Sequence, residues 1–254
     1  MSELNSRSVI TDLAISLVFF TRLPLPPFDM PGRKLGDAIW AAPVAGIVVG
    51  LTGGVVYTLA HALGINEGVA AALALAATMI VTGCLHEDGL ADTADAFGGG
   101  RSIERKLEIM RDSRIGTYGA AALVLSVLLR WASLASLPGG ASAVCALIAA
   151  HAASRGILPI LMQRTPAARD SGLAASAGSI ADATALVALA IGAIPLLLLG
   201  IVQGLLLAIL TGVFAWWLRG LFIRQIGGLT GDTIGAAQQI LEIAILVVAG
   251  AVLS

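Results

Sequence analysis

The chain alternates between long apolar stretches and short polar connections, and the apolar stretches have nearly constant length. Each contains roughly the 20 residues that an α-helix needs to cross about 30 Å of hydrocarbon at about 1.5 Å per residue. Because a backbone in lipid must satisfy its own N–H and C=O groups, we expect these stretches to be helices. The seven predicted spans are 37–62, 68–90, 116–137, 141–163, 183–202, 204–225 and 233–253. The pattern predicts an all-α, polytopic membrane bundle that forms one domain over residues 1–254.

Residues 1–36 differ from these spans, and we predict that they lie at the membrane surface. Leu13, Leu17 and Phe20 follow helical spacing, but the helix over 8–22 is too short and too polar to cross a bilayer comfortably. Prolines within 23–27 end this helix, because proline cannot continue one. The segment contains acidic residues and lacks a clear cleavage site, so we expect it to be retained rather than removed as a signal peptide.

Composition supports the membrane interpretation. Hydrophobic residues make up 57% of the chain and charged residues 12%, with a mean hydropathy of +0.93. Soluble domains average about 25% charged residues, so this balance excludes a disordered chain, a nucleic-acid binder with a basic face and a soluble globular enzyme. Cys84 and Cys145 lie in apolar stretches without metal-ligand spacing, which favours packing roles over a disulfide. Gly46 and Gly50 have the spacing of a helix-contact motif, but in a chain with 30 glycines chance explains the pair equally well.

The positions of the basic residues predict the orientation in the membrane. Of the 15 Lys and Arg, all except Arg130 lie in or beside connections on one side of the predicted bundle. The opposite connections, 61–68, 138–141 and 202–204, contain none. By the positive-inside rule, the N-terminus is cytoplasmic and the C-terminus lies outside.

Three aspartates at the end of the second predicted span share one helix face. Asp88, Asp92 and Asp95 are spaced i, i+4 and i+7, and Glu87 lies beside them. Carboxylates this close repel each other unless a cation or a proton separates them. Mg²⁺ takes oxygen ligands and usually shares them with substrate phosphates. A solvated acidic cap is the alternative, but the apolar residues that surround the acids favour a metal site.

The segment 86–115 continues beyond three glycines into a predicted amphipathic helix on the cytoplasmic surface. Ser102 is suited to cap this helix. Its apolar stripe consists of Ile103, Leu107 and Met110. Beyond it, Asp112 could return to the metal site, and Arg111 and Arg114 could bind phosphate bidentately. Interfacial anchoring of the helix and snorkelling of the two arginines are the alternatives.

A second acidic motif occupies residues 227–242. One helical arc contains Asp232, Gln239 and Glu242, at i, i+7 and i+10. Glu242 lies about ten residues, roughly 15 Å, into the predicted span, where a carboxylate is costly and marks a functional site. Asp232 or Thr230 could instead cap the span. His151 and Arg155 share a helix face, and an Arg155–Glu242 pair could be functional or purely structural.

Carboxylates, a bound cation and several arginines at one membrane rim suit phosphoryl transfer, in which the catalyst positions groups and neutralises charge on oxygen. The same residues resemble the cobalamin synthase family, whose full name is adenosylcobinamide-GDP ribazoletransferase. The similar segments, in order along the chain, are 21–26, 86–95, 106–119, 154–156 and 227–236.

The resemblance implies an integral enzyme of a prokaryotic cytoplasmic membrane, with its active site facing the cytoplasm and with Mg²⁺ as cofactor. Its substrates would be adenosylcobinamide-GDP and α-ribazole or α-ribazole 5′-phosphate. A ribose hydroxyl would attack the corrinoid-side phosphorus and GMP would leave. The product would be adenosylcobalamin or its 5′-phosphate. Membrane lipid is the other expected partner, and a homo-oligomer is compatible with the sequence.

Each candidate residue can be given an expected role. Candidate metal ligands are Asp88, Asp92, Asp95, Asp112, Asp232, Glu87 and Glu242. Candidate substrate-binding residues are Arg111, Arg114, Arg155, Thr230 and Gln239. Asp92, Asp95 and His86 are the candidate catalytic residues, with His86 or a carboxylate as the base for the ribose hydroxyl. Glu87 stands where the family more often has an apolar residue, so the alternative for this candidate ligand is an extra acid that does not bind the metal.

Two other functions have some support in the sequence. The grouping of Asp88, Gly89, Ala91 and Asp92 loosely resembles the CDP-alcohol phosphotransferases, which also expel a nucleoside monophosphate, but the likeness covers one segment only. A transporter could use the intramembrane acids as an ion path. No internal repeat or broken-helix signature supports that reading.

Overall fold

The computed structural model describes residues 6–25 and 33–253, and this part of the chain is helical without a named strand. The α-helices are α1 (Ser6–Phe20), α2 (Leu35–Ala38), α3 (Ala42–Ala62), α4 (Glu67–Thr82), α5 (Leu85–Gly99), α6 (Ile103–Ile109), α7 (Thr117–Ala135), α8 (Gly140–Gly156), α9 (Leu158–Gln163), α10 (Leu173–Ser176), α11 (Asp182–Ala193), α12 (Ile201–Ile226) and α13 (Gly231–Leu253). Two 3₁₀-helices, η1 (Ile39–Ala41) and η2 (Ile194–Leu199), extend α2 and α11.

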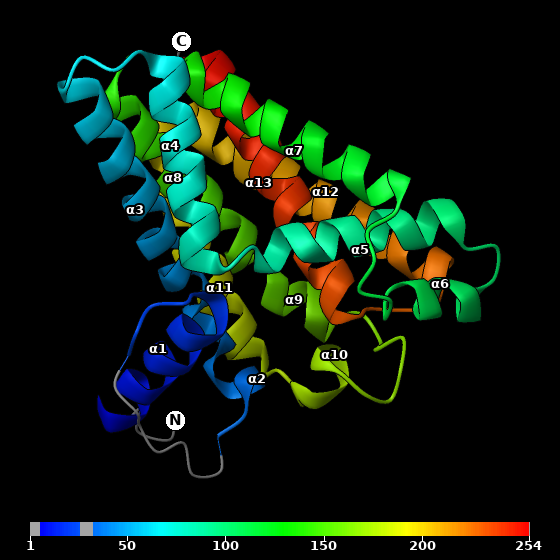
Figure 1. The fold of residues 1–254 in the computed structure, drawn as a ribbon. Coiled ribbons are helices and arrows are strands. Elements are labelled where there is room, and N and C mark those ends of the chain that lie inside the picture. The colour runs from blue at the N-terminus through cyan, green and yellow to red at the C-terminus, as the bar shows by residue number, and fades with distance from the viewer. Residues whose placement is uncertain (1–5, 26–32, 254) are drawn as a thin grey trace.

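The predicted membrane bundle is confirmed. Within the described residues, 6 helices are long and apolar enough to cross a membrane, or 7 if the bent pair α4–α5 counts as one span. The protein is therefore a polytopic helical membrane protein. α1, α6 and α10 lie toward one end of the bundle, and the last turn of α13 lies at the other (Figure 1).

The second predicted span, 68–90, is wrong in its last part. α4 ends at Thr82, and α5 leaves it at 89°. The turn consists of Gly83 and Cys84, both in the left-handed region with φ of 62° and 57°. Glycine adopts this conformation without steric cost and commonly ends a helix. As a result, α5 crosses the bundle instead of following it, and it carries the aspartate motif sideways across α13 (Figure 1).

Two further spans are interrupted near their ends. The fourth predicted span changes from α8 to α9 at Gly156 and Ile157, just before Pro159. The fifth continues from α11 into η2, whose second residue is Pro195. Proline lacks the N–H that a regular helix would use at these positions, so the change of helix geometry falls beside it.

The bundle core is built where α3 packs against α8. A Cβ atom at Gly46 would lie 2.2 Å from the carbonyl oxygen of His151, and one at Gly50 would lie 2.7 Å from Cα of Ile148. Side chains at these positions would force the helices apart, so the glycine pair is a true contact motif. The spacing of Gly46 and Gly50 carried no weight in the sequence analysis, because only their position opposite α8 distinguishes them from other glycines.

The surface helices are held by specific contacts. The helix predicted over 8–22 forms as α1 over Ser6–Phe20, two residues earlier at each end, and its buried Asp12 accepts two hydrogen bonds from the Arg33 guanidinium and one from Trp40 Nε1. α6 forms as predicted, with the Ser102 hydroxyl accepting a hydrogen bond from the Arg105 N–H at 3.2 Å. The cap and the amphipathic pattern could both be predicted from the sequence, because they depend on residues within one helical turn.

Candidate active site

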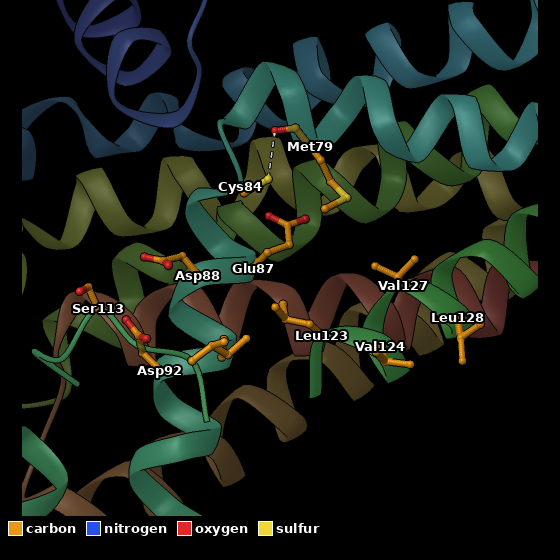
Figure 2. A pocket seen from close by; sticks show the side chains of 12 residues that line it. Met79, Cys84, Glu87, Asp88, Asp92, Ser113, Leu123, Val124, Val127 and Leu128 are labelled. Atoms are coloured by element: carbon orange, nitrogen blue, oxygen red, sulfur yellow. Dashed lines mark hydrogen bonds between the residues drawn. The ribbon is translucent and has the colours of Figure 1, made fainter. Parts of the chain in front are cut away.

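The right-angle bend at Gly83 opens a pocket between α4, α5 and α7. Its volume is about 530 Å³. Asp88, Asp92 and Ser113 gather at one end of this pocket (Figure 2). The other end is formed by apolar side chains, among them Met79 of α4 and Leu123, Val124, Val127 and Leu128 of α7. The pocket therefore joins a polar, acidic end to an apolar wall between membrane helices.

Three of the predicted metal ligands, Glu87, Asp88 and Asp92, line this pocket. Asp88 is exposed and Asp92 is half-buried, one helical turn apart on α5. Asp232 of α13 lies close enough to repel Asp92 electrostatically, as do Asp88 and Asp95. Within residues 6–25 and 33–253, no three His, Cys, Asp or Glu side chains are arranged so that they could hold a metal ion by themselves. Two carboxylates do fit Mg²⁺, which usually takes one or two protein carboxylates and completes its shell with water and substrate phosphate.

Asp95 has a different set of neighbours from Asp88 and Asp92. Its side chain is buried and accepts hydrogen bonds from the backbone N–H groups of Gly116 and Gly119, at 2.6 and 2.8 Å. These donors belong to the first turn of α7 and the residue that precedes it, so the carboxylate also complements the positive end of that helix dipole. In this structure Asp95 fixes the entry to α7 and with it the loop that contains Ser113.

Glu87 connects the pocket to a buried ionic network. Its side chain lines the pocket, and its Oε1 accepts a hydrogen bond from Arg130 Nη1 of α7 at 2.9 Å. The same Arg130 nitrogen lies 3.2 Å from Oε1 of Glu242 on α13. All three side chains are at most 6% exposed. Both glutamates therefore contact Arg130. This is the one basic residue that lies apart from the connections on the predicted cytoplasmic side.

The network continues from Glu242 to α8. Glu242 Oε2 lies 2.9 Å from His151 Nδ1, 2.6 Å from Gln238 Nε2 and 3.8 Å from Arg155 Nη1. The predicted Arg155–Glu242 pair is thus present, but it is the longest of these contacts. With its proton on Nδ1, His151 donates to Glu242, while the Arg155 guanidinium donates to the His151 carbonyl at 3.1 Å. Glu242 is surrounded by donors and does not line the pocket, a geometry that suits a structural anion.

Two other predicted site residues lie behind the pocket wall. His86 is buried, stacks on Phe20 and has Nδ1 3.3 Å from Arg155 Nη2. Gln239 is buried, accepts a hydrogen bond from the Ser126 hydroxyl at 3.0 Å, and donates to Glu87 Oε1 at 3.4 Å. Neither lines the pocket. The geometry thus lends no support to His86 as the base or to Gln239 as a substrate contact.

The remaining predicted residues do not line the pocket. Asp112 is partly exposed, and hydrogen bonds from the Arg114 guanidinium lower the pKa of its carboxyl to about 2. Arg111 and Arg114 flank Ser113, which lines the pocket. The Thr230 hydroxyl accepts a hydrogen bond from the Thr233 N–H at 3.2 Å, so Thr230 caps α13 as the alternative interpretation predicted.

The sequence analysis missed one basic residue near the acidic end of the site. Asp232 forms an ion pair with Arg169 at 3.0 Å. The loop that carries Arg169 is fixed to the start of α13 by two backbone hydrogen bonds, from Ala168 N–H to Leu229 O and from Leu229 N–H to Pro166 O, both 2.8 Å long. This places one more guanidinium beside the acidic end of the site.

Comparison with known proteins identifies the family to which this site belongs. Residues 12–250 match the family described as cobalamin-5-phosphate synthase. The chain belongs to the cobalamin-5-phosphate synthase family. The match covers nearly the whole chain, whereas the likeness to CDP-alcohol phosphotransferases rests on one segment. The family expected from the motifs is therefore confirmed.

Three similar relatives share one name. A protein of Mesorhizobium japonicum named adenosylcobinamide-GDP ribazoletransferase is 56% identical over 251 residues, which are 99% of this chain and 97% of the relative. Proteins of the same name from Bradyrhizobium diazoefficiens and Ralstonia nicotianae are 50% and 40% identical, over 96% and 94% of this chain and 95% of each relative. No solved structure matches the chain.

Proposed function

We propose that this membrane enzyme transfers the adenosylcobinamide-phosphate group of adenosylcobinamide-GDP to a ribose hydroxyl of α-ribazole or α-ribazole 5′-phosphate. The ribose hydroxyl oxygen forms a new bond to the corrinoid-side phosphorus and gives up its proton, the bond from that phosphorus to the bridging oxygen of the diphosphate breaks, and GMP leaves with the bridging oxygen. The product of the reaction is adenosylcobalamin or its 5′-phosphate. Membership of the cobalamin-5-phosphate synthase family and the uniform name of the relatives support this reaction.

The observation that carries the proposal is the two-ended pocket beside α5. Asp88 and Asp92 at its acidic end would hold Mg²⁺, with Asp232 nearby on α13. The ion would neutralise the diphosphate charge that two bare carboxylates would repel. The apolar wall from α7 suits the large corrinoid part of the substrate, which would enter between membrane helices. This arrangement gives a physical reason for a membrane-embedded enzyme.

Groups at the rim would bind and orient the phosphates. Arg111 and Arg114 stand on either side of Ser113, and Arg169 approaches from the loop before α10. Guanidinium groups bind phosphate oxygens bidentately and stabilise the charge that develops as GMP leaves. We place the proton acceptor for the ribose hydroxyl at Asp92 rather than at His86, because Asp92 faces the pocket and His86 does not.

We further propose that the site faces the cytoplasm of a prokaryotic cell across its cytoplasmic membrane. The basic residues of the α5–α7 segment and of the loop before α10 lie on the same side as the acidic end of the pocket. This side is cytoplasmic by the positive-inside rule.

The deciding experiment measures GMP release from adenosylcobinamide-GDP and α-ribazole by the purified protein, with and without Mg²⁺. Wild type should release GMP only with the metal, and Asp92→Asn should lose release while it keeps its thermal unfolding profile in detergent. Asp182→Asn is the matched control, because Asp182 is 78% exposed at the start of α11. Near-normal turnover by Asp92→Asn would refute the site assignment, and absence of release by wild type under all conditions would refute the function.

A further inference from the structure

A second cavity, remote from the acidic site, lies on the side of the bundle formed by α9, α11 and α12. Its volume is about 430 Å³. Its walls are apolar, with Leu161 of α9, Leu189 of α11 and Ala208 and Ala215 of α12. Arg164 and Arg219 stand at one end. The cavity is thus a largely apolar groove that ends in two guanidinium groups.

The two arginines are held in place by contacts that leave positive charge in excess. Arg219 Nε donates to the Arg164 carbonyl at 2.8 Å, and its guanidinium carbon lies 4.5 Å from the ring centre of Trp216. Arg164 approaches Asp182 at 3.5 Å, and both side chains are more than half exposed, so water weakens that pair. No acidic side chain in the described part of the chain forms a salt bridge with Arg219.

The groove opens on a face that meets lipid. The neighbouring α12 residues Ile209 and Val213 are each 63% exposed, and Trp216 is 62% exposed. Large apolar side chains this exposed on a membrane helix face hydrocarbon. Gly212 lies in the groove, and a Cβ atom built there would meet no other atom within 4 Å. The space is therefore open along α12 below the two arginines.

We propose that this groove binds one anionic phospholipid, with the headgroup phosphate between Arg164 and Arg219 and an acyl chain along Gly212. The two ends of the groove match the two ends of such a lipid in charge and polarity. Both arginines belong to the basic side of the bundle, and the cytoplasmic leaflet is the one that carries anionic lipid. A zwitterionic lipid would add its own cation beside the two guanidiniums and so would bind less well.

The test uses full-length protein in nanodiscs that contain equal amounts of phosphatidylglycerol and phosphatidylcholine. Native mass spectrometry after release in mild detergent measures which lipid stays bound. We expect wild type to retain phosphatidylglycerol in a one-to-one complex. Arg164→Gln and Arg219→Gln should each lower this preference roughly fivefold, which corresponds to about one favourable charge contact. Arg224→Gln, in the last turn of α12 outside the groove, is the matched charge control.

The groove itself is tested by filling it. Gly212→Leu keeps both arginines and meets open space, so it should fold and lose the retained lipid, while Gly212→Ala should keep it. Thermal unfolding of each variant checks that it is folded. Three outcomes would overturn the proposal: equal retention of both lipids by wild type, retention unaffected by Gly212→Leu and both arginine variants, or a Gly212→Leu variant that changes from dimer to monomer, which would make the groove a contact between two copies.

Discussion

Arg130 is the residue whose removal tests the buried network most directly. Its guanidinium contacts Glu87 at 2.9 Å and Glu242 at 3.2 Å, and it is 1% exposed. The network contains two glutamates, Glu87 and Glu242, and two arginines, Arg130 and Arg155, so their formal charges balance. Arg130→Met keeps a long apolar side chain in place but leaves one negative charge unpaired among α5, α7 and α13.

The expected cost follows from the burial of the partners. Removal of one member of a fully buried ion pair costs about 3–5 kcal/mol, because the remaining charge has neither water nor a partner. A typical protein has only about 5–15 kcal/mol of net stability. If the dependence known for soluble domains of this size holds, at about 2–4 °C per kcal/mol, the melting temperature falls by roughly 6–20 °C.

The assay follows thermal unfolding in detergent by intrinsic fluorescence of the chain's 4 tryptophans. The double variant Arg130→Met, Glu87→Gln restores charge balance, so it should be more stable than Arg130→Met alone even though it carries one more substitution. Arg105→Met is the control, because Arg105 belongs to an exposed pair of small expected value. Two results would contradict this reasoning. One is an Arg130→Met variant with the melting temperature of wild type. The other is a double variant whose loss of stability equals the sum of the losses of the two single variants.

Three further predictions test other parts of the structure. Asp95→Asn should weaken the charge-assisted hydrogen bonds to Gly116 and Gly119 by about 1–3 kcal/mol and expose the loop before α7 to limited proteolysis; an unchanged cleavage pattern would contradict this anchor. Gly46→Leu should abolish folded yield because it forces α3 from α8, whereas Gly212→Leu should express normally, and equal yields would refute the close-contact argument. The lowered pKa of Asp112, about 2 against an ordinary 3.8, means that its pair with Arg114 contributes above pH 3.8 and is lost only as the pH falls through about 2. The pH profile of GMP release between about pH 5 and 9 should therefore have the same shape in wild type and in Asp112→Asn, and a shifted acidic limb in the variant would show that Asp112 titrates in the working range.

Much of the site could be predicted because the signals are local. The spacing of Asp88 and Asp92 places them on one helix face whatever the rest of the chain does, and the Ser102 cap depends on residues within one turn. The tertiary structure separated Asp95 from this pair, since its partners are the backbone N–H groups of Gly116 and Gly119. A pattern of acids does not reveal which of them another segment will bind.

Hydropathy and charge along the chain were enough to predict a membrane bundle of helices and the side on which the acidic and basic motifs gather. Hydropathy and charge act on each segment separately, through transfer into lipid and through the membrane surface, so they can be read without a fold. Three features could be seen only in the folded protein: α5 turns by 89° from α4, Arg130 joins Glu87 to Glu242, and Gly46 lies against α8. These features depend on which helices become neighbours, and that choice is made by packing between residues far apart in the chain.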